Sequence, residues 1–222
     1  MSLGVGFTYR PEATRWQDAS ARIWVKQGVY NRDWRNLVNM KTIVVVDYDQ
    51  TWPQVFEQLR SNVLHAVGDL AVSIEHVGST AVPGLAGKPV IDMCVVVASP
   101  DDVPLAIERL ATAGYEHRGN LGIDGREAFK QPDALPKHHM YVCATKNLAL
   151  LNFLAVRDYL RTHSEKAIEY GALKKRLASH FRHDIDSYID GKTDLILGIL
   201  REVGFSKDQI IAIGAVDLKA PT

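Results

Sequence analysis

Residues 72–97 read VSIEHVGSTAVPGLAGKPVIDMCVVV and carry the strongest structural signal in the chain. Two runs rich in β-branched residues, 72–77 and 90–97, each predict a strand. The loop between them opens with Gly78-Ser79, and Asp92 stands near the start of the second run. Glycine and serine let backbone N–H groups approach an anion closely, and a carboxylate can hold a divalent cation. The stretch therefore predicts a phosphate-binding loop beside a carboxylate. These are the smallest set of groups that nucleotidyl transfer requires.

Helical and strand patterns alternate around this stretch. Apolar residues at helical spacing follow Pro53 and end at Gly68, and Ser99 opens a further helix with acidic residues behind it. Besides 72–77 and 90–97, strands are expected at 43–46, 115–118, 127–131 and 139–144, and the last three helices at 148–162, 165–181 and 187–203. The chain therefore predicts an α+β fold, a mixed sheet with flanking helices and a C-terminal helical layer.

Three segments are expected along the chain. Residues 1–39 hold an excess of arginine and three of the four tryptophans, and their apolar residues follow neither a helical nor a strand period for long. Met40 leads directly into the first predicted strand. We interpret 1–39 as a poorly ordered or mis-annotated extension with Met40 as the initiator, or as an appendage whose tryptophans dock on the core. Residues 40–205 form the predicted domain, and 206–222 a C-terminal tail.

Bulk composition limits the classes of function. Among 222 residues, 26 Lys and Arg balance 26 Asp and Glu, whereas a binder of long nucleic acid usually carries a basic excess. Cys94 and Cys143 lie in apolar runs, which is typical of buried reduced thiols in a cytoplasmic protein. No apolar run is long enough for a membrane span, so no membrane partner is expected.

Several segments resemble one family in order and spacing. Tyr48 and Trp52 match its opening Tyr-x-x-x-Trp, and four further segments look like its middle strands and late helices: 125–130, 137–143, 157–163 and 188–192. Over about residues 43–205 the chain resembles the GrpB family, which is assigned to the polymerase-β-like nucleotidyltransferase superfamily. The resemblance implies a nucleotidyltransferase-like fold, a nucleotide or phosphorylated small molecule as ligand, and magnesium as cofactor. Where the superfamily places a second carboxylate, this chain has Cys94, and a thiol is a poor ligand for magnesium.

The candidate phosphate ligands lie in the loop and in the helical layer. Gly78, Ser79 and Thr80 would hold phosphate oxygens, and Lys88 either closes the loop over a phosphate or is a solvated loop lysine. Two further cations, Arg161 and Lys192, are expected on the cleft side of the later helices, where the alternative is an ordinary solvated or ion-paired face.

The candidate catalytic and metal-binding residues lie on the strands. Asp92 interrupts an apolar strand, so it is either a metal ligand or a structural cap of the loop. Glu127 is the candidate third acid for the metal, unless it pairs with the basic residues beside it. The family resemblance also marks His139 as a substrate contact or acid–base group, on the same strand face as Tyr141.

Two functions follow from these residues. One is nucleotidyl transfer with magnesium, in which Gly78 and Ser79 hold the phosphates while Asp92 and Glu127 position the metal. The other is a non-catalytic binding or accessory protein that has lost the metal centre. GrpB-like domains fused to dephospho-coenzyme A kinase connect that second function to coenzyme A metabolism. Nucleic-acid binding through residues 1–39 is a remote third.

Overall fold

The computed structural model describes residues 42–217, and the remaining residues at both ends lie outside that range. The interpretation of residues 1–39 and of Met40 as the initiator therefore falls outside the described residues. No helix in the described range is both long and apolar enough to cross a lipid bilayer.

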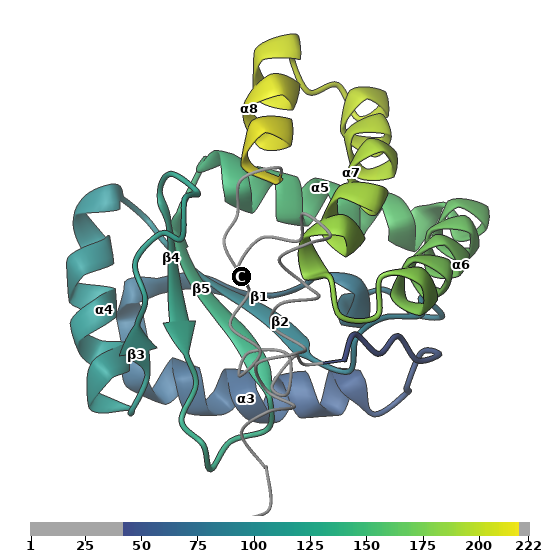
Figure 1. The fold of residues 1–222 in the computed structure, drawn as a ribbon. Coiled ribbons are helices and arrows are strands. Elements are labelled where there is room, and N and C mark those ends of the chain that lie inside the picture. The colour runs from purple at the N-terminus through teal and green to yellow at the C-terminus, as the bar shows by residue number, and fades with distance from the viewer. Residues whose placement is uncertain (1–41, 218–222) are drawn as a thin grey trace, which may run out of the picture. The chain divides into compact units, whose positions relative to one another are not determined.

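A five-stranded mixed sheet forms the centre of the described unit (Figure 1). Its order is β1-β2-β5-β4-β3, in which β2 and β5 run parallel and all other neighbours are antiparallel. The strands are β1 (Ala71–Val77), β2 (Ile91–Val97), β3 (Glu116–His117), β4 (Arg126–Lys130) and β5 (His138–Ala144). The two β-branched runs at 72–77 and 90–97 thus form neighbouring strands, and β5 lies beside β2, the strand that carries Asp92.

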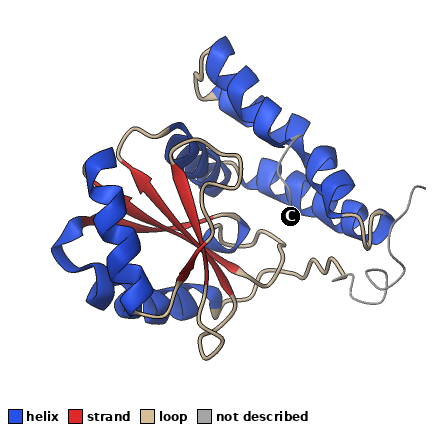
Figure 2. Ribbon diagram, turned by 60° about the vertical axis from the view of Figure 1, so that its left-hand side comes forward, coloured by secondary structure: helices blue, strands red, loops and turns tan. Residues whose placement is uncertain are grey.

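Helices cover both faces of the sheet (Figure 2). On one face, α3 (Trp52–Val67) and α4 (Val103–Thr112) pack against the alternate residues of β2 and β5 that include Met93 and Met140, both fully buried. On the other face, α5 (Leu148–Thr162) covers the intervening residues of the same strands. Because successive side chains point to opposite faces, each of the central strands is apolar over most of both faces.

The C-terminal helical layer continues from α5. It consists of α6 (Ser164–His180), α7 (Ile185–Glu202) and α8 (Lys207–Asp217). Asn147 caps α5 and Asp184 caps α7, each by accepting a bond from a backbone N–H group in the first turn. A buried cluster joins α5, α6 and α7 to residues 82–85 of the loop between β1 and β2, so the layer is attached directly to the predicted phosphate loop.

The α+β class, the mixed sheet and the C-terminal helical layer are confirmed, with local corrections. Residues 43–46 do not form a strand, because only Val46 pairs, through a single bridge to Gly87. The predicted strand at 115–118 is reduced to the two residues of β3. The predicted tail contains α8, whose Ile210 and Ile213 are buried against α7. The apolar residues at 210–216 run almost continuously rather than at helical spacing, so the sequence carried no helical period there.

Candidate functional site

The turn after β1 depends on Gly78. This residue has φ +70° and ψ −167°, a conformation that is essentially restricted to glycine, and a short 3₁₀ turn, Ser79–Ala81, follows it. A Cβ atom at Gly78 would lie 2.4 Å from Oδ2 of Asp92. Glycine is therefore required both by the backbone and by the close approach of the Asp92 carboxylate to the turn.

Asp92 and His139 form a hydrogen-bonded pair across neighbouring parallel strands. The register of β2 and β5 places them side by side, with 2.7 Å between Nδ1 of His139 and Oδ1 of Asp92. Burial acts to raise the pKa of Asp92, but the His139 bond and the charges of His139, Lys88 and Lys192 outweigh it, so the pKa is lowered. The ionised carboxylate can only accept a hydrogen bond, so Nδ1 of His139 is the donor.

Ser79 is bonded to a lysine from the helical layer. Nζ of Lys174, in α6, donates to Oγ of Ser79 at 2.6 Å, and the lysine is only 2% exposed. Its Nζ also lies 4.4 Å from the centre of the Tyr170 ring. Burial, followed by repulsion from Lys192 and Lys88, lowers the pKa of Lys174 to about 7. Attraction by Asp92 opposes this shift without cancelling it.

Two more lysines complete what we call the lysine cluster, defined as Lys88, Lys174 and Lys192. Lys88 and Lys192 lie over the ring of Tyr188, with Nζ 5.9 Å and 5.5 Å from its centre. Burial and then Lys192 lower the pKa of Lys88. Asp92 is the carboxylate that interacts with all three lysines. The cluster therefore carries a positive excess next to the Gly78-Ser79 turn.

Two predicted phosphate ligands, Thr80 and Arg161, make hydrogen bonds that hold the turn. The buried hydroxyl of Thr80 is hydrogen-bonded to Nε2 of His76 at 2.9 Å. Nε of Arg161, in α5, donates to the carbonyl oxygen of Ala81 at 2.9 Å. The structure brings Lys192 to Lys88 and Lys174, whereas Arg161 is engaged at the far end of the turn.

The structure does not bring Glu127 to Asp92. Glu127 pairs in register with Val142, on the face of the sheet covered by α3 and α4, whereas Asp92 shares the opposite face with Cys94. The Glu127 carboxylate lies 2.6 Å from Nε2 of His117 on β3. The prediction that Glu127 and Asp92 share a metal is therefore wrong. The register of β4 places the Glu127 side chain on the face of the sheet opposite to Asp92, and a shift of one residue would have reversed this.

Cys94 lies on the same face as Asp92, as the strand period predicts, but it is fully buried. A hydrogen bond with Cys143, and then burial, hold the pKa of the Cys94 thiol well above its usual range. Both cysteines are free thiols. Across residues 42–217, no three His, Cys, Asp or Glu side chains gather as metal ligands. The site holds one carboxylate, Asp92, which is bonded to His139 and surrounded by lysines. The net positive charge of such a site attracts anions rather than a divalent cation, so these residues do not fit a resident magnesium ion.

Lys174 was missing from the sequence prediction, although the sequence held a signal for it. The buried stripe of α6 contains Ala167, Tyr170, Gly171 and Ala178, and position 174 lies on that stripe. A lysine at an apolar position of an amphipathic helix is unusual, because a buried ammonium group is costly. The neighbouring Lys175 and Arg176 made the segment look like an ordinary solvated face.

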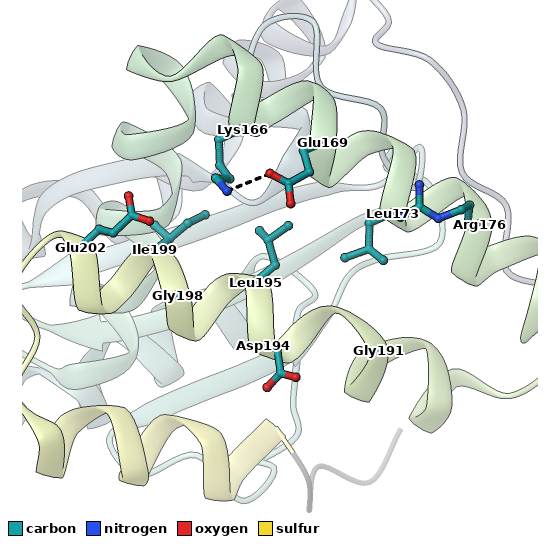
Figure 3. Close-up of a pocket in the computed structure, with 10 residues that line it drawn as sticks. All are labelled: Lys166, Glu169, Leu173, Arg176, Gly191, Asp194, Leu195, Gly198, Ile199 and Glu202. Carbon is teal, nitrogen blue, oxygen red and sulfur yellow. Dashed lines mark hydrogen bonds and ion pairs between the residues drawn. The ribbon is translucent and has the colours of Figure 1, made fainter.

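A separate groove of about 410 Å³ lies between α6 and α7 (Figure 3). Its lining combines charged side chains, including the ion pair of Lys166 and Glu169, with the small residues Gly191 and Gly198. None of the residues that the sequence predicted for the site lines this groove. The candidate site is therefore the lysine cluster with Ser79, Asp92 and His139.

Relatives match the same part of the chain. The family model described as GrpB protein matches residues 42–202. YqkA of Bacillus subtilis is 34% identical over 161 residues, 72% of this chain and 47% of YqkA. The glutamate-rich protein GrpB of Alkalihalophilus pseudofirmus is 32% identical over 75% of this chain and 98% of its own length. A dephospho-CoA kinase of Mycolicibacterium paratuberculosis matches over only 93 residues, at 33% identity, 40% of this chain and 22% of the kinase.

A solved structure supports the same family. The crystal structure of GrpB from Enterococcus faecalis superposes with a TM-score of 0.65 at 34% identity, covering 72% of this chain and 96% of that one. A remote likeness to the Cid1 poly(U) polymerase, with a TM-score of 0.42 and 12% identity over 76% of this chain and 48% of Cid1, is one of fold alone. The chain belongs to the GrpB family.

Proposed function

We propose that the chain binds a phosphorylated small molecule, such as a nucleotide, at the lysine cluster. The observation that carries the proposal is that Lys88, Lys174 and Lys192 all interact with the carboxylate of Asp92, while Lys174 also donates to Ser79. Among the described residues, no carboxylate lies within ion-pair distance of Lys174, which is almost completely buried. A bound phosphate would supply the missing negative charge.

The electrostatics favour an anion over a metal–anion complex. Like charges held close together in a partly buried site repel, and this repulsion contributes to the lowered pKa values of Lys88 and Lys174. An anion that contacts all three ammonium groups relieves the repulsion and makes charge-assisted hydrogen bonds, which are about twice as strong as neutral ones. A magnesium ion on the phosphates would reduce that gain, so binding should not require magnesium.

Nucleotidyl transfer to an acceptor is the second candidate, and the Asp92–His139 pair favours it. With Nδ1 bonded to Asp92 at 2.7 Å, Nε2 of His139 is able to accept a proton from an acceptor hydroxyl. The imidazole is 43% exposed, so an acceptor can reach it. Transfer of label from an α-phosphate-labelled nucleotide to an acceptor, lost in His139→Gln with binding retained, would support this role. Label transfer that survives His139→Gln would exclude it.

Calorimetric titration tests the binding proposal. We expect at least one member of a panel of nucleoside triphosphates, coenzyme A and dephospho-coenzyme A to bind in the presence of EDTA. The two coenzymes belong in the panel because of the short match to dephospho-CoA kinases. Lys88→Met should weaken binding roughly tenfold or more, since it removes a charged hydrogen-bond donor. Asp92→Asn should leave binding unchanged or tighten it a few-fold, since it removes a negative charge beside the anion.

Lys130→Met is the matched control, because Lys130 is an exposed lysine on β4, two strands from β2. Its affinity should equal that of the wild-type protein. Binding that needs magnesium and disappears in Asp92→Asn would instead place a working metal at Asp92. Absence of binding across the whole panel would refute the proposed function.

A further inference from the structure

Arg126 is a buried cation whose hydrogen-bonding capacity is largely unused. It lies on β4, and only 8% of its surface is exposed. A guanidinium group has five N–H donors, yet within residues 42–217 it makes one hydrogen bond, from Nη2 to the carbonyl oxygen of Asn120 at 3.3 Å. Among the same residues its buried Nε has no partner, and no carboxylate lies within ion-pair distance. A cation in this state is costly, because its lost contacts with water are not replaced.

The single hydrogen bond of Arg126 is not needed to hold the loop between β3 and β4. The carbonyl oxygen of Asn120 already accepts from the backbone N–H group of Ile123 at 3.1 Å. Nδ2 of Asn147 holds the same loop from the start of α5, by donating to the carbonyl oxygen of Asp124 at 3.1 Å. A role in closing this loop therefore does not account for a buried guanidinium group.

Aromatic rings connect Arg126 to the Asp92–His139 pair. Cζ of Arg126 lies 4.7 Å from the centre of the Tyr141 ring, and that centre lies 6.4 Å from the centre of the His139 ring. The three side chains share one face of the neighbouring strands β4 and β5 (Figure 1), the face that also carries Asp92. The contact with Tyr141 offsets only part of the cost of removing a guanidinium group from water.

We propose that Arg126 is the anchor of a second anion subsite, which binds a carboxylate group. This subsite goes beyond the proposed function and does not depend on the lysine cluster. A carboxylate accepts two parallel N–H bonds from a guanidinium group, which leaves neither of its oxygens without a donor. The other side chains nearby are the Tyr141 ring and the apolar Ile123 and Phe153, so the remaining oxygens of a phosphate would face apolar groups. The rest of the ligand extends over Tyr141 toward the partly exposed His139.

NMR of the arginine Nε–Hε groups tests the subsite, with acetate as the probe and acetamide as its uncharged match. The Arg126 signal is assigned by its loss in Arg126→Lys. We expect acetate to shift this signal saturably at constant ionic strength, because the carboxylate bonds the guanidinium group directly. Acetamide should leave the signal in place. An Arg126 signal that acetate does not shift, or that acetamide shifts equally, would overturn the proposal.

Thermal unfolding provides a second readout that also applies to variants. A ligand that binds only the folded state raises Tm, so acetate should raise the Tm of the wild-type protein above its value in chloride of equal ionic strength. Arg126→Lys keeps the charge but loses the planar fork, and it should weaken acetate binding about tenfold or more. Arg60→Lys is the matched control, because the Arg60 side chain is 42% exposed on α3. Its response to acetate should equal that of the wild type.

Lys88→Met separates this subsite from the lysine cluster. Its response to acetate should equal that of the wild-type protein, because Lys88 belongs to the cluster and not to the subsite at Arg126. An acetate response that disappears in Lys88→Met, or that persists undiminished in Arg126→Lys, would place the carboxylate elsewhere and overturn this inference. Neither result would affect the proposed function, which is tested by phosphorylated ligands.

Discussion

Replacing Lys174 by methionine should make the protein more stable at neutral and acidic pH. Lys174 is 98% buried, since only 2% of its surface is exposed, and its folded-state pKa is about 7 against about 10.4 in an unfolded chain. Between these values the unfolded state binds more protons, so wild-type stability rises with pH. Below pH 7 the full penalty applies, about 5 kcal/mol relative to pH above 10.4. Methionine fills a similar volume and carries no such penalty.

Urea unfolding at several pH values measures this effect. The stability advantage of Lys174→Met should be constant between pH 5 and 6.5 and should shrink by roughly 1.4 kcal/mol per pH unit from pH 7.5 to 9.5. Lys175→Met is the control, because the neighbouring lysine is exposed and its ion pair with Asp47 is worth little. A Lys174→Met protein less stable than the wild type, with no pH dependence, would show that Lys174 has an ordinary ammonium group.

Gly78→Ala should destabilise the protein by about 3 kcal/mol or more, through two costs of comparable size. The first is backbone strain, because φ +70° with ψ −167° is nearly closed to alanine. The second is the contact of the new Cβ with Asp92, 2.4 Å from Oδ2, which forces the carboxylate away and strains its bond to His139. The change in unfolding free energy and the NMR signals of His139 report the two costs.

Two comparisons separate these costs. Gly84→Ala also has a positive φ, +78°, but its Cβ would meet nothing within 4 Å, so it should show backbone strain alone. In an Asp92→Ala background, Gly78→Ala should cost clearly less than in the wild type, because the clash is gone. Equal costs in the two backgrounds would mean that Asp92 does not lie against the turn.

Most of the fold could be predicted because each element has a local signal. The two β-branched runs became β1 and β2, and the predicted helix 148–162 coincides with α5, whose start is fixed by the Asn147 cap. The predicted elements that the structure does not contain lacked such a signal or depended on contacts with distant segments of the chain. Residues 43–46 are β-branched like a strand, yet only Val46 finds a partner, since a strand needs a neighbour as well as a propensity.

The site could be predicted only in part, because its parts come from distant segments. The turn and Asp92 were found together, since they share one loop and the following strand. Glu127 was assigned to the same site without knowledge of the register of β4, which places its side chain on the other face. Lys174 meets Ser79 across 95 residues of sequence, and only the packing of α6 onto the loop brings the two together.

Soaking a crystal in tungstate, a phosphate analogue with strong anomalous scattering, tests anion binding at the lysine cluster directly. Binding at the lysine cluster predicts an anomalous peak within hydrogen-bond distance of Lys174 Nζ, with Lys88 and Lys192 turned toward it. The peak should be absent from crystals of Lys174→Met. A peak confined to exposed lysines, or one at the cluster that persists in Lys174→Met, would show that the cluster does not bind phosphate through Lys174.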